Sequence, residues 1–326
     1  MTVTYYTSSD TSAPVLNDVQ GALYALLLAV LVNGYGAKAA AGWTNPYTGT
    51  AGQSGVFKQG GGNGFYLNVN DTAATGTATY AQAIGASGAT AYGVANLTNP
   101  FPTTAQVSGG VFWPRFPYSS ATSPSRWAVI ATNKTFYMWN EGDGTNNGSQ
   151  KYQQVFWFGD MDSFVGSDAH FTQIMGNTTG AQRTMTYTAM GADSVGLYCE
   201  AAYNGTTVQI AQGMMSDYYK NGSQAIMGGT TSAASSIQYP NPEDGALYLS
   251  YIYTQEHATG GNSVRGFMPG IWNPDSYVIG GLFNAFDTIP SMAADALNGK
   301  TFHFFPLSNT GTLNGGIVFE TSNTWG

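Results

Sequence analysis

The longest apolar pattern with a helical period lies near the start of the chain, in residues 12–43. Pro14 precedes the pattern, Asn17 can cap its first turn, and the Asn33-Gly34 pair can end it. Bulky side chains recur in it at spacings of three and four, at Leu16, Leu23, Leu26, Leu27, Val30 and Leu31. The pattern predicts one dominant helix at about residues 17–33.

Small side chains form a second stripe on this predicted helix, at Ala22, Ala25 and Ala29. Because almost no polar face separates the two stripes, the helix must be covered on more than one side. We expect the bulky stripe to lie in the core and the small stripe to pack closely against the same chain or a second copy. The most apolar run, residues 22–32, spans 11 residues. A membrane span needs about 20, so none is predicted.

Apolar runs and period-two alternation predict β-strands in the rest of the chain. The strongest are residues 126–131, 135–139 and 153–158, and Asn133-Lys134 predicts a tight hairpin between the first two. We expect these three runs to form a meander whose sheet holds the core. Further strands are predicted at residues 2–6, 56–59, 65–70, 78–84, 195–202, 246–253, 301–306 and 316–321.

Turn-forming residues between these strands predict long loops. Residues 101–114 and 268–274 combine proline, glycine and aromatic residues, which predicts two stiff aromatic loops, and residues 141–149 predict a polar loop. The predicted fold class is mainly β, with antiparallel sheets in a sandwich-like or barrel-like arrangement and one long N-terminal helix. We interpret residues 1–326 as a single unit, and the alternative is a soft subdivision into residues 1–178 and 179–326.

Composition narrows the class of protein. Charged residues make up 9% of the chain, against about 25% in ordinary globular domains, and the 14% of aromatic residues excludes disorder. The net charge is −8 and the ten basic residues are scattered, so no direct nucleic-acid binding is predicted. The chain begins without a basic segment before an apolar core, so we expect no signal peptide and synthesis in a cytoplasm.

Asp160 and Asp162 are the closest acidic pair in a predicted strand. Positions two apart on an extended strand face one side at about 6.5–7 Å, a separation between the approximate ranges for retaining and inverting glycosidases, so a sugar-cleaving site is one interpretation. The interpretation that we favour is a turn whose aspartates cap backbone amides. Residues 141–148 resemble an oxygen-rich calcium loop with Asp143 and Asn146 as ligands, but they lack the EF-hand spacing, which favours a plain hairpin loop.

No other pattern predicts catalysis or a cofactor. His170, His257 and His303 are far apart in the sequence, which favours structural roles over a three-histidine zinc site. Cys199 is the only cysteine, which excludes an intrachain disulfide and a cysteine-rich metal site. No G-x-S-x-G motif occurs where a strand meets a helix. We predict no enzymatic activity, no cofactor and no metal.

Aromatic residues of the two predicted stiff loops are the candidate interaction sites. Two of them lie in the first loop, two lie just after it and one lies in the second loop: Phe112 and Trp113, Phe116 and Tyr118, and Trp272. Stiff aromatic loops suit protein–protein contacts, where aromatic residues dominate the binding energy, and they suit stacking on carbohydrate. Burial against the chain's own sheet is the third interpretation.

Several longer strings resemble one known family, the structural proteins of tailed-bacteriophage virions. They follow one another over almost the whole chain: SAPVLN and LVNGYGAKAAAGWT near the start, FYLNVND at 65–71, FPTTAQVSGGVFWP at 101–114, RWAVIATNKTFYMW at 126–139, FWFGDMDSF at 156–164, YPNPEDGALYLS at 239–250 and RGFMPGIWNP at 265–274. The resemblance implies a head-associated or tail-associated virion component. It carries over no active-site residue.

The resemblance and the composition together give the expected function. We expect a non-enzymatic structural component of the virion, assembled in the host cytoplasm as a symmetric oligomer in the tail or baseplate or as a decoration on the capsid. Its partners would be copies of itself and other virion proteins. The alternative is a receptor-binding or carbohydrate-binding module that recognises a host-surface glycan.

Overall fold

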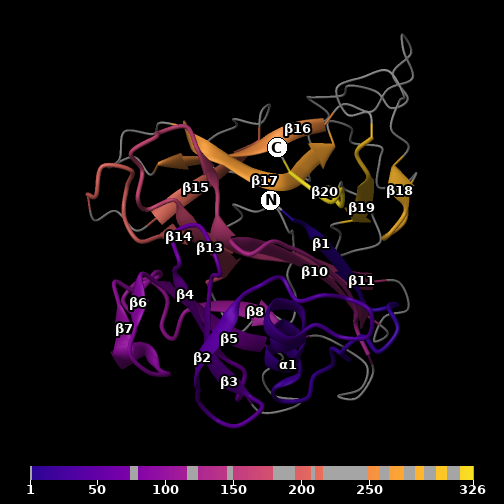
Figure 1. Cartoon of the computed structure of the whole chain (residues 1–326), viewed down its shortest axis with the longest axis horizontal. Coiled ribbons are helices and arrows are strands. Elements are labelled where there is room, and N and C mark those ends of the chain that lie inside the picture. Colours follow the sequence, from indigo (N-terminus) through magenta and orange to yellow (C-terminus); the bar gives the residue numbers. More distant parts are fainter. Residues whose placement is uncertain are drawn as a thin grey trace.

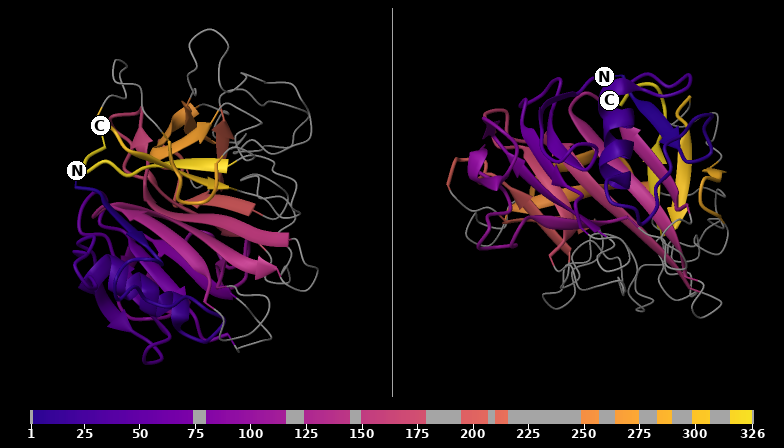
Figure 2. Two further views of the ribbon diagram at one scale, coloured as in Figure 1. Left: turned by 90° about the vertical axis from the view of Figure 1, so that its right-hand side faces the viewer. Right: turned by 90° about the horizontal axis from the view of Figure 1, so that it is seen from below.

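The computed structural model of the chain is mainly β and is built from antiparallel sheets, as the sequence predicts (Figure 1). Seen from the side, its strands form three layers, with a helix packed in the N-terminal layer (Figure 2). The structure describes residues 2–73, 80–115, 124–144, 150–178, 195–206, 210–215, 249–256, 264–274, 283–289, 299–306 and 316–325. Within this part, no helix is long and apolar enough to cross a membrane.

The middle layer contains the predicted meander. Its strands lie side by side in the order β1 (Thr4–Thr7), β9 (Arg126–Ala131), β10 (Thr135–Gly144), β11 (Gln150–Asp160) and β13 (Thr172–Asn177). The hairpin at Asn133-Lys134 is confirmed. The predicted loop at residues 141–149 is wrong in its first part, because β10 and β11 stay paired as far as Gly144 and Gln150.

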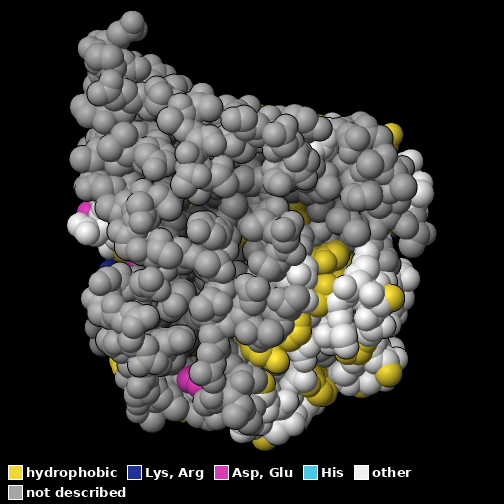
Figure 3. All heavy atoms as spheres, turned by 180° about the vertical axis from the view of Figure 1, so that it is seen from behind, with side chains coloured by type: hydrophobic (Ala, Val, Ile, Leu, Met, Phe, Trp, Pro, Cys, Tyr) yellow, Lys and Arg dark blue, Asp and Glu magenta, His cyan; other side chains and the backbone are white. Residues whose placement is uncertain are grey.

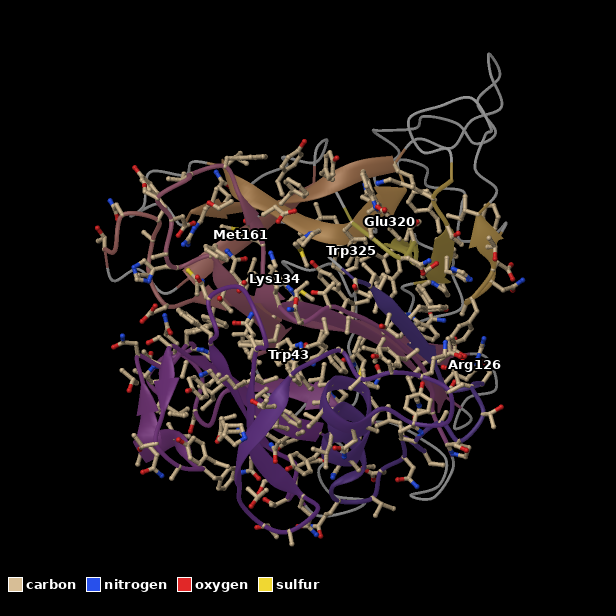
Figure 4. The ribbon with its side chains drawn as sticks, in the orientation of Figure 1. Trp43, Arg126, Lys134, Met161, Glu320 and Trp325 are labelled. Carbon is tan, nitrogen blue, oxygen red and sulfur yellow. The ribbon has the colours of Figure 1, made fainter. Side chains whose placement is uncertain are left out.

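Both faces of this middle sheet are buried. The side chains that point to the N-terminal layer include Trp127, Val129, Phe136, Met138, Phe156 and Phe158. Those that point to the C-terminal layer include Ala128, Ile130, Tyr137, Trp139, Val155 and Trp157. Trp43 and Trp325, which belong to the two separate cores, lie on opposite sides of the sheet (Figure 4). Burial on both faces explains why these strands are apolar at consecutive positions.

The N-terminal layer is a sheet with a small hairpin beside it. Its strands follow the order β2 (Thr44–Thr48), β3 (Ser54–Lys58), β4 (Tyr66–Asn70), β5 (Tyr80–Ala86) and β8 (Val111–Pro114), and the hairpin consists of β6 (Gly88–Ala89), the 3-10 turn η2 (Val94–Asn96) and β7 (Leu97–Thr98). Strands β3, β4 and β5 correspond to the strands predicted at residues 56–59, 65–70 and 78–84, and β4 pairs with both of the others. The predicted loop at 101–114 ends in strand β8, which also meets β13.

The C-terminal layer continues the ladder from β13. Its order is β14 (Val195–Cys199), β15 (Ile210–Met215), β16 (Leu249–Glu256), β17 (Val264–Pro274), β20 (Gly316–Glu320), β19 (Phe302–Pro306) and β18 (Thr288–Ile289). The short strand β12 (Asp162–Ser163) leaves the end of β11 and pairs with β17, which curves the ladder into a partly closed barrel.

The prediction of a second aromatic loop is wrong, because residues 268–274 form the latter half of strand β17. A register shift between β16 and β17 accommodates the irregular segment. Gly270 has a φ of 74°, and the Trp325 ring occupies the space where its Cβ would be. Glycine at this position therefore lets a sharp local change of backbone direction persist within the ladder.

The single α-helix of the described part is shorter than predicted. Helix α1 spans Ala22–Leu28 and continues as a π-helical turn, η1 (Ala29–Asn33), so its end agrees with the prediction and its start does not. The residue before it, Gly21, has a φ of 83°. Asn17 instead accepts a hydrogen bond from the Val19 amide and caps nothing in the helix.

A carboxylate from a distant segment begins the helix. Asp71, which follows β4, accepts hydrogen bonds from the amides of Leu23 and Tyr24 at 2.9 and 3.1 Å. Its other oxygen lies 2.8 Å from the Arg115 guanidinium, and both side chains are fully buried. The helix therefore depends on a partner 48 residues away, which local capping rules could not predict.

The bulky stripe of α1 lies in the core, as predicted. Leu23, Leu27 and Val30 are fully buried among the side chains of the N-terminal core. We predict that Leu27→Ala lowers the free energy of unfolding by about 2–5 kcal/mol, through lost burial and the cavity that remains. Chemical denaturation would measure the change.

Leu28→Ala is the matched control, because Leu28 lies on the same helix and is only partly buried. Its cost should be clearly smaller than that of Leu27→Ala. Equal costs at the two positions would contradict the burial pattern of the helix.

Candidate functional site

The small stripe of α1 lies at the surface of the subunit. Ala25 is exposed, and Ala22 and Ala29 are partly buried. The segment that leads into the helix also exposes two apolar side chains, Val15 and Val19. The exposed side of the helix therefore carries small uncharged side chains, where a surface helix usually carries charged or polar residues.

Trp113 is a core residue. Its side chain is fully buried, its ring stacks on Phe156 at 5.5 Å, and its indole nitrogen donates to the Met175 carbonyl at 2.7 Å. Its neighbour Phe112 is partly buried and meets Tyr80 edge to face at 4.7 Å. For Trp113 the structure therefore shows the third interpretation, burial against the chain's own sheets.

Phe116 and Tyr118, the candidates that follow the first predicted loop, lie outside the described residues.

Figure 3 shows the side of the molecule behind that of Figure 1, where hydrophobic side chains form a band across the described part. Lys and Arg side chains do not gather on the described part of that side.

Trp272 lies at one end of a continuous row of aromatic side chains on β16, β17 and the residue after β12. We call this row the aromatic face, and its members are Phe164, Tyr251, Tyr253, Phe267 and Trp272. The Tyr251 ring lies 4.5 Å from Trp272 and 4.6 Å from Phe267, and Phe164 lies 5.8 Å from Phe267. Trp272 itself is almost buried and donates to Glu320 at 3.1 Å.

Exposure rises along the aromatic face away from Trp272. The exposed fraction is 8% for Trp272, 40% for Tyr251 and 58% for Phe164. Tyr253 and Phe267 are half-buried. Large aromatic side chains that remain exposed together are uncommon on soluble proteins and mark contact sites.

Strand alternation creates this face. Tyr251 and Tyr253 point outward on β16, while Ile252 and Thr254 between and after them are fully buried. The period-two pattern was visible in the sequence, but it does not indicate which face of the strand is covered. Phe164 and Phe267 could not be assigned to this face from the sequence, because Phe267 joins it through the register of β16 and β17 and Phe164 through the pairing of β12 with β17.

A buried ion pair holds the segment that carries Phe164. Arg265 of β17 donates two hydrogen bonds of 2.7 Å to the two oxygens of Asp168, and both side chains are buried. Arg265 also donates to the carbonyls of His170 and Ala201, and Ser163 donates to Asp168. These contacts fix the residues on both sides of Phe164 against β17.

The same contacts set the acidity of Asp168. Burial alone would raise the pKa of this carboxyl, but hydrogen bonds from Arg265, the arginine charge, and donation by the His170 amide and Ser163 hold it below the ordinary value. Asp168 is therefore charged in the folded chain under all but strongly acidic conditions.

Asp160 and Asp162 differ in burial and in bonding, since Asp160 is buried and Asp162 is exposed. Asp160 ends β11 and accepts hydrogen bonds from Thr172 at 2.6 Å, Gln59 at 2.9 Å and the Asn63 amide at 3.1 Å. Burial raises the pKa of Asp160, and these bonds oppose the shift. Its carboxylate thus ties three segments together, one of them through a backbone amide.

Asp162 begins β12 and directly follows Met161 in the sequence; Figure 4 labels Met161. Asp162 is exposed and pairs across the strands with Phe267. Residues directly opposite each other in an antiparallel pair share one face of the sheet. Burial of part of its surroundings raises the pKa of Asp162, and the charge of Lys134 opposes the shift.

In the described part, the two histidine side chains make hydrogen-bond contacts with neighbouring side chains. The Nδ1 atom of His170 lies 2.8 Å from Glu200, whose other oxygen accepts from Asn99 at 2.6 Å. His303 lies 3.0 Å from the Thr321 hydroxyl, and burial lowers the pKa of its imidazole. His257 is outside the described residues. Among the described residues, no group of three or more His, Cys, Asp or Glu could hold a metal ion.

The remaining candidates of the sequence are placed as follows. Cys199 is buried next to Arg265 at 3.5 Å. The two carboxylate oxygens of Glu141 accept hydrogen bonds from the Arg126 guanidinium at 3.1 Å and from the Gln153 side-chain amide at 2.7 Å. The two calcium-ligand candidates, the Asp143 side chain and Asn146, lie outside the described part.

Comparison with known proteins gave no assignment. No protein-family model matches the chain, and no curated protein matches its sequence. The arrangement described above is therefore interpreted from its own geometry.

The Asp168–Arg265 pair predicts a pH dependence of stability. A carboxyl with a lowered pKa in the folded chain stabilises the fold above its unfolded pKa, about 4, and this contribution is lost as the pH falls through the folded value. We expect Asp168→Asn to cost about 3–5 kcal/mol near neutral pH, because it leaves a buried arginine without its counter-charge.

The difference in unfolding free energy between the wild type and Asp168→Asn should shrink as the pH falls below about 4. Chemical denaturation at a series of pH values measures it. Asp287→Asn, which removes a carboxylate from an exposed turn, is the control and should show a much smaller difference. A difference for Asp168→Asn that stays constant from neutral to acidic pH would refute this account.

Proposed function

We propose that the chain is a non-enzymatic structural component of a tailed-bacteriophage virion that assembles as a symmetric oligomer. The resemblance of its strings to virion structural proteins motivates the class of protein. The surface of helix α1 carries the proposal, because it presents small, uncharged side chains around the exposed Ala25. Such a surface allows another backbone to approach closely.

The bonding of the candidate chemical groups supports this reading over an enzymatic one. The Asp160 carboxylate, the Asp168–Arg265 pair and the Glu200–His170 pair each join segments that are distant in the sequence. Side chains with these contacts hold the architecture together, and their donors and acceptors are engaged with neighbours of the same chain.

The helix surface predicts the effect of one substitution on assembly. Ala25→Leu should weaken or abolish the oligomer, because a bulky side chain separates two closely packed backbones. The unfolding of the isolated subunit should change by no more than about 0.5 kcal/mol, as at other exposed positions. Size-exclusion chromatography with light scattering measures the mass, and thermal melting monitors the fold.

Ala105→Leu is the matched control, since Ala105 is an exposed alanine in a turn of the N-terminal layer. It should leave the mass unchanged. An unaltered oligomer in Ala25→Leu, or a chain that is monomeric to begin with, would count against assembly through this helix.

The proposal includes two placements in the particle. One is the tail, as a baseplate, tip or fibre-attachment component, and the other is the capsid surface, as a decoration protein. Quantitative proteomics of purified virions distinguishes them, because a decoration protein is present in far more copies than a tail component. Absence of the protein from purified virions would refute both placements.

A further inference from the structure

The aromatic face of the C-terminal layer is a second surface, distinct from helix α1. We propose that it binds a neutral carbohydrate chain, with Asp162 accepting hydrogen bonds from the sugar hydroxyls. This inference goes beyond the structural role proposed above, because it assigns a ligand class to a different part of the molecule. It rests on the ring contacts, their exposure and the position of Asp162.

The rings provide a stacking surface. Tyr251 is exposed and its ring lies 4.5 Å from that of its cross-strand partner Trp272, while Phe164 and Phe267 extend the row at 5.8 Å from each other. Neighbouring rings are tilted against each other by between 31° and 60°. The faces of aromatic rings are electronegative and attract the polarised C–H groups of a sugar ring.

A polar group stands beside the rings. Asp162 pairs with Phe267, and Phe267 pairs with Tyr253, so the three residues form one row across β12, β17 and β16. An exposed carboxylate accepts several hydrogen bonds, and tyrosine hydroxyls both donate and accept. Apolar rings next to such groups match a ligand that has C–H faces and hydroxyl edges.

The charges around the face distinguish among ligand classes. Arg265, the basic residue of β17, is buried against Asp168 and cannot meet an anionic ligand at the surface. Asp162 would repel such a ligand. Two copies of the chain that met through this face would have to desolvate the Asp162 carboxylate, which is costly even though the charge of Lys134 acts on it. A neutral polyhydroxylated ligand would instead keep the carboxylate hydrogen-bonded.

The support of the face keeps it preorganised. Phe164 follows Ser163, whose hydroxyl donates to Asp168, and the Phe164 amide donates to the Arg265 carbonyl at 2.8 Å. The backbone that carries the most exposed ring is thus attached to β17 by hydrogen bonds on both sides. A surface that is ordered before binding loses little conformational freedom when the ligand arrives.

Affinity gel electrophoresis of the full chain tests the proposal. The gels contain dextran, amylose, galactomannan or xylan as neutral polysaccharides, and alginate as the acidic comparison. A glycan array of neutral and acidic oligosaccharides extends the range of ligands. We expect retardation by at least one neutral polysaccharide or binding to neutral array members, and no preference for alginate or acidic glycans.

Variants locate the site. Tyr251→Ala and Phe164→Ala should each weaken the binding by about tenfold or more, as expected for aromatic anchors, and Asp162→Asn should weaken it by a smaller factor. Tyr203→Ala is the matched control, since Tyr203 is an exposed tyrosine outside the aromatic face, and it should bind as the wild type does. Thermal melting of each variant verifies that the fold is retained.

Three outcomes would overturn the proposal. The first is no binding to any neutral glycan, and the second is binding that survives both aromatic substitutions. The third is a loss of oligomer mass in Tyr251→Ala, which would identify the face as a contact between copies. Ala25→Leu keeps the two proposals separable, because it should alter assembly and leave binding to the immobilised glycan intact.

Discussion

The structure depends on a middle sheet that is buried on both faces. Consecutive residues of β9, β10 and β11 enter two different cores, so nearly every position in these strands must be apolar and correctly shaped. The large indoles among them still satisfy their N–H groups, Trp127 at the Pro14 carbonyl and Trp139 at the Pro306 carbonyl. The two bonds point to opposite layers, so the middle sheet also fixes where the outer segments attach.

Two buried arginines give the layers their specific attachment points. Arg115 joins Asp71 at the start of helix α1, and Arg265 joins Asp168 beside the aromatic face. Burial of a charge pair contributes little net stability, but either charge alone would be costly. In a chain with ten basic residues in all, the use of two in this way indicates that a unique arrangement matters for these segments.

The regular part of this fold could be predicted from the sequence. The meander, the strands at residues 56–59 and 65–70 and the final strands follow from periodicity and turn residues, which are local signals. The start of the helix could not be predicted, because Asp71 caps it from another strand. Residues 268–274 resemble a loop in composition, but pairing on both sides makes them a strand.

The candidate sites were harder to predict than the fold. Trp113 and Trp272 have similar sequence surroundings, with proline, glycine and other aromatic residues nearby, and both are buried, yet Trp113 lies in the N-terminal core and Trp272 lies at the end of a row whose other end is exposed. Tyr251, Tyr253 and Phe267 become neighbours only through the register of β16 and β17. Periodicity shows that a strand has two faces, and tertiary pairing decides which one remains open.

The two cores on either side of the middle sheet have a consequence for the order of folding during synthesis. The described members of the N-terminal core come from residues 6–198, whereas the C-terminal core also requires residues 252–325. When the ribosome has produced about the first two thirds of the chain, one face of the middle sheet can be covered while the other still exposes Tyr137, Trp139 and Trp157. Such an intermediate is prone to aggregation. The nascent chain would therefore benefit from a chaperone until its last strands emerge.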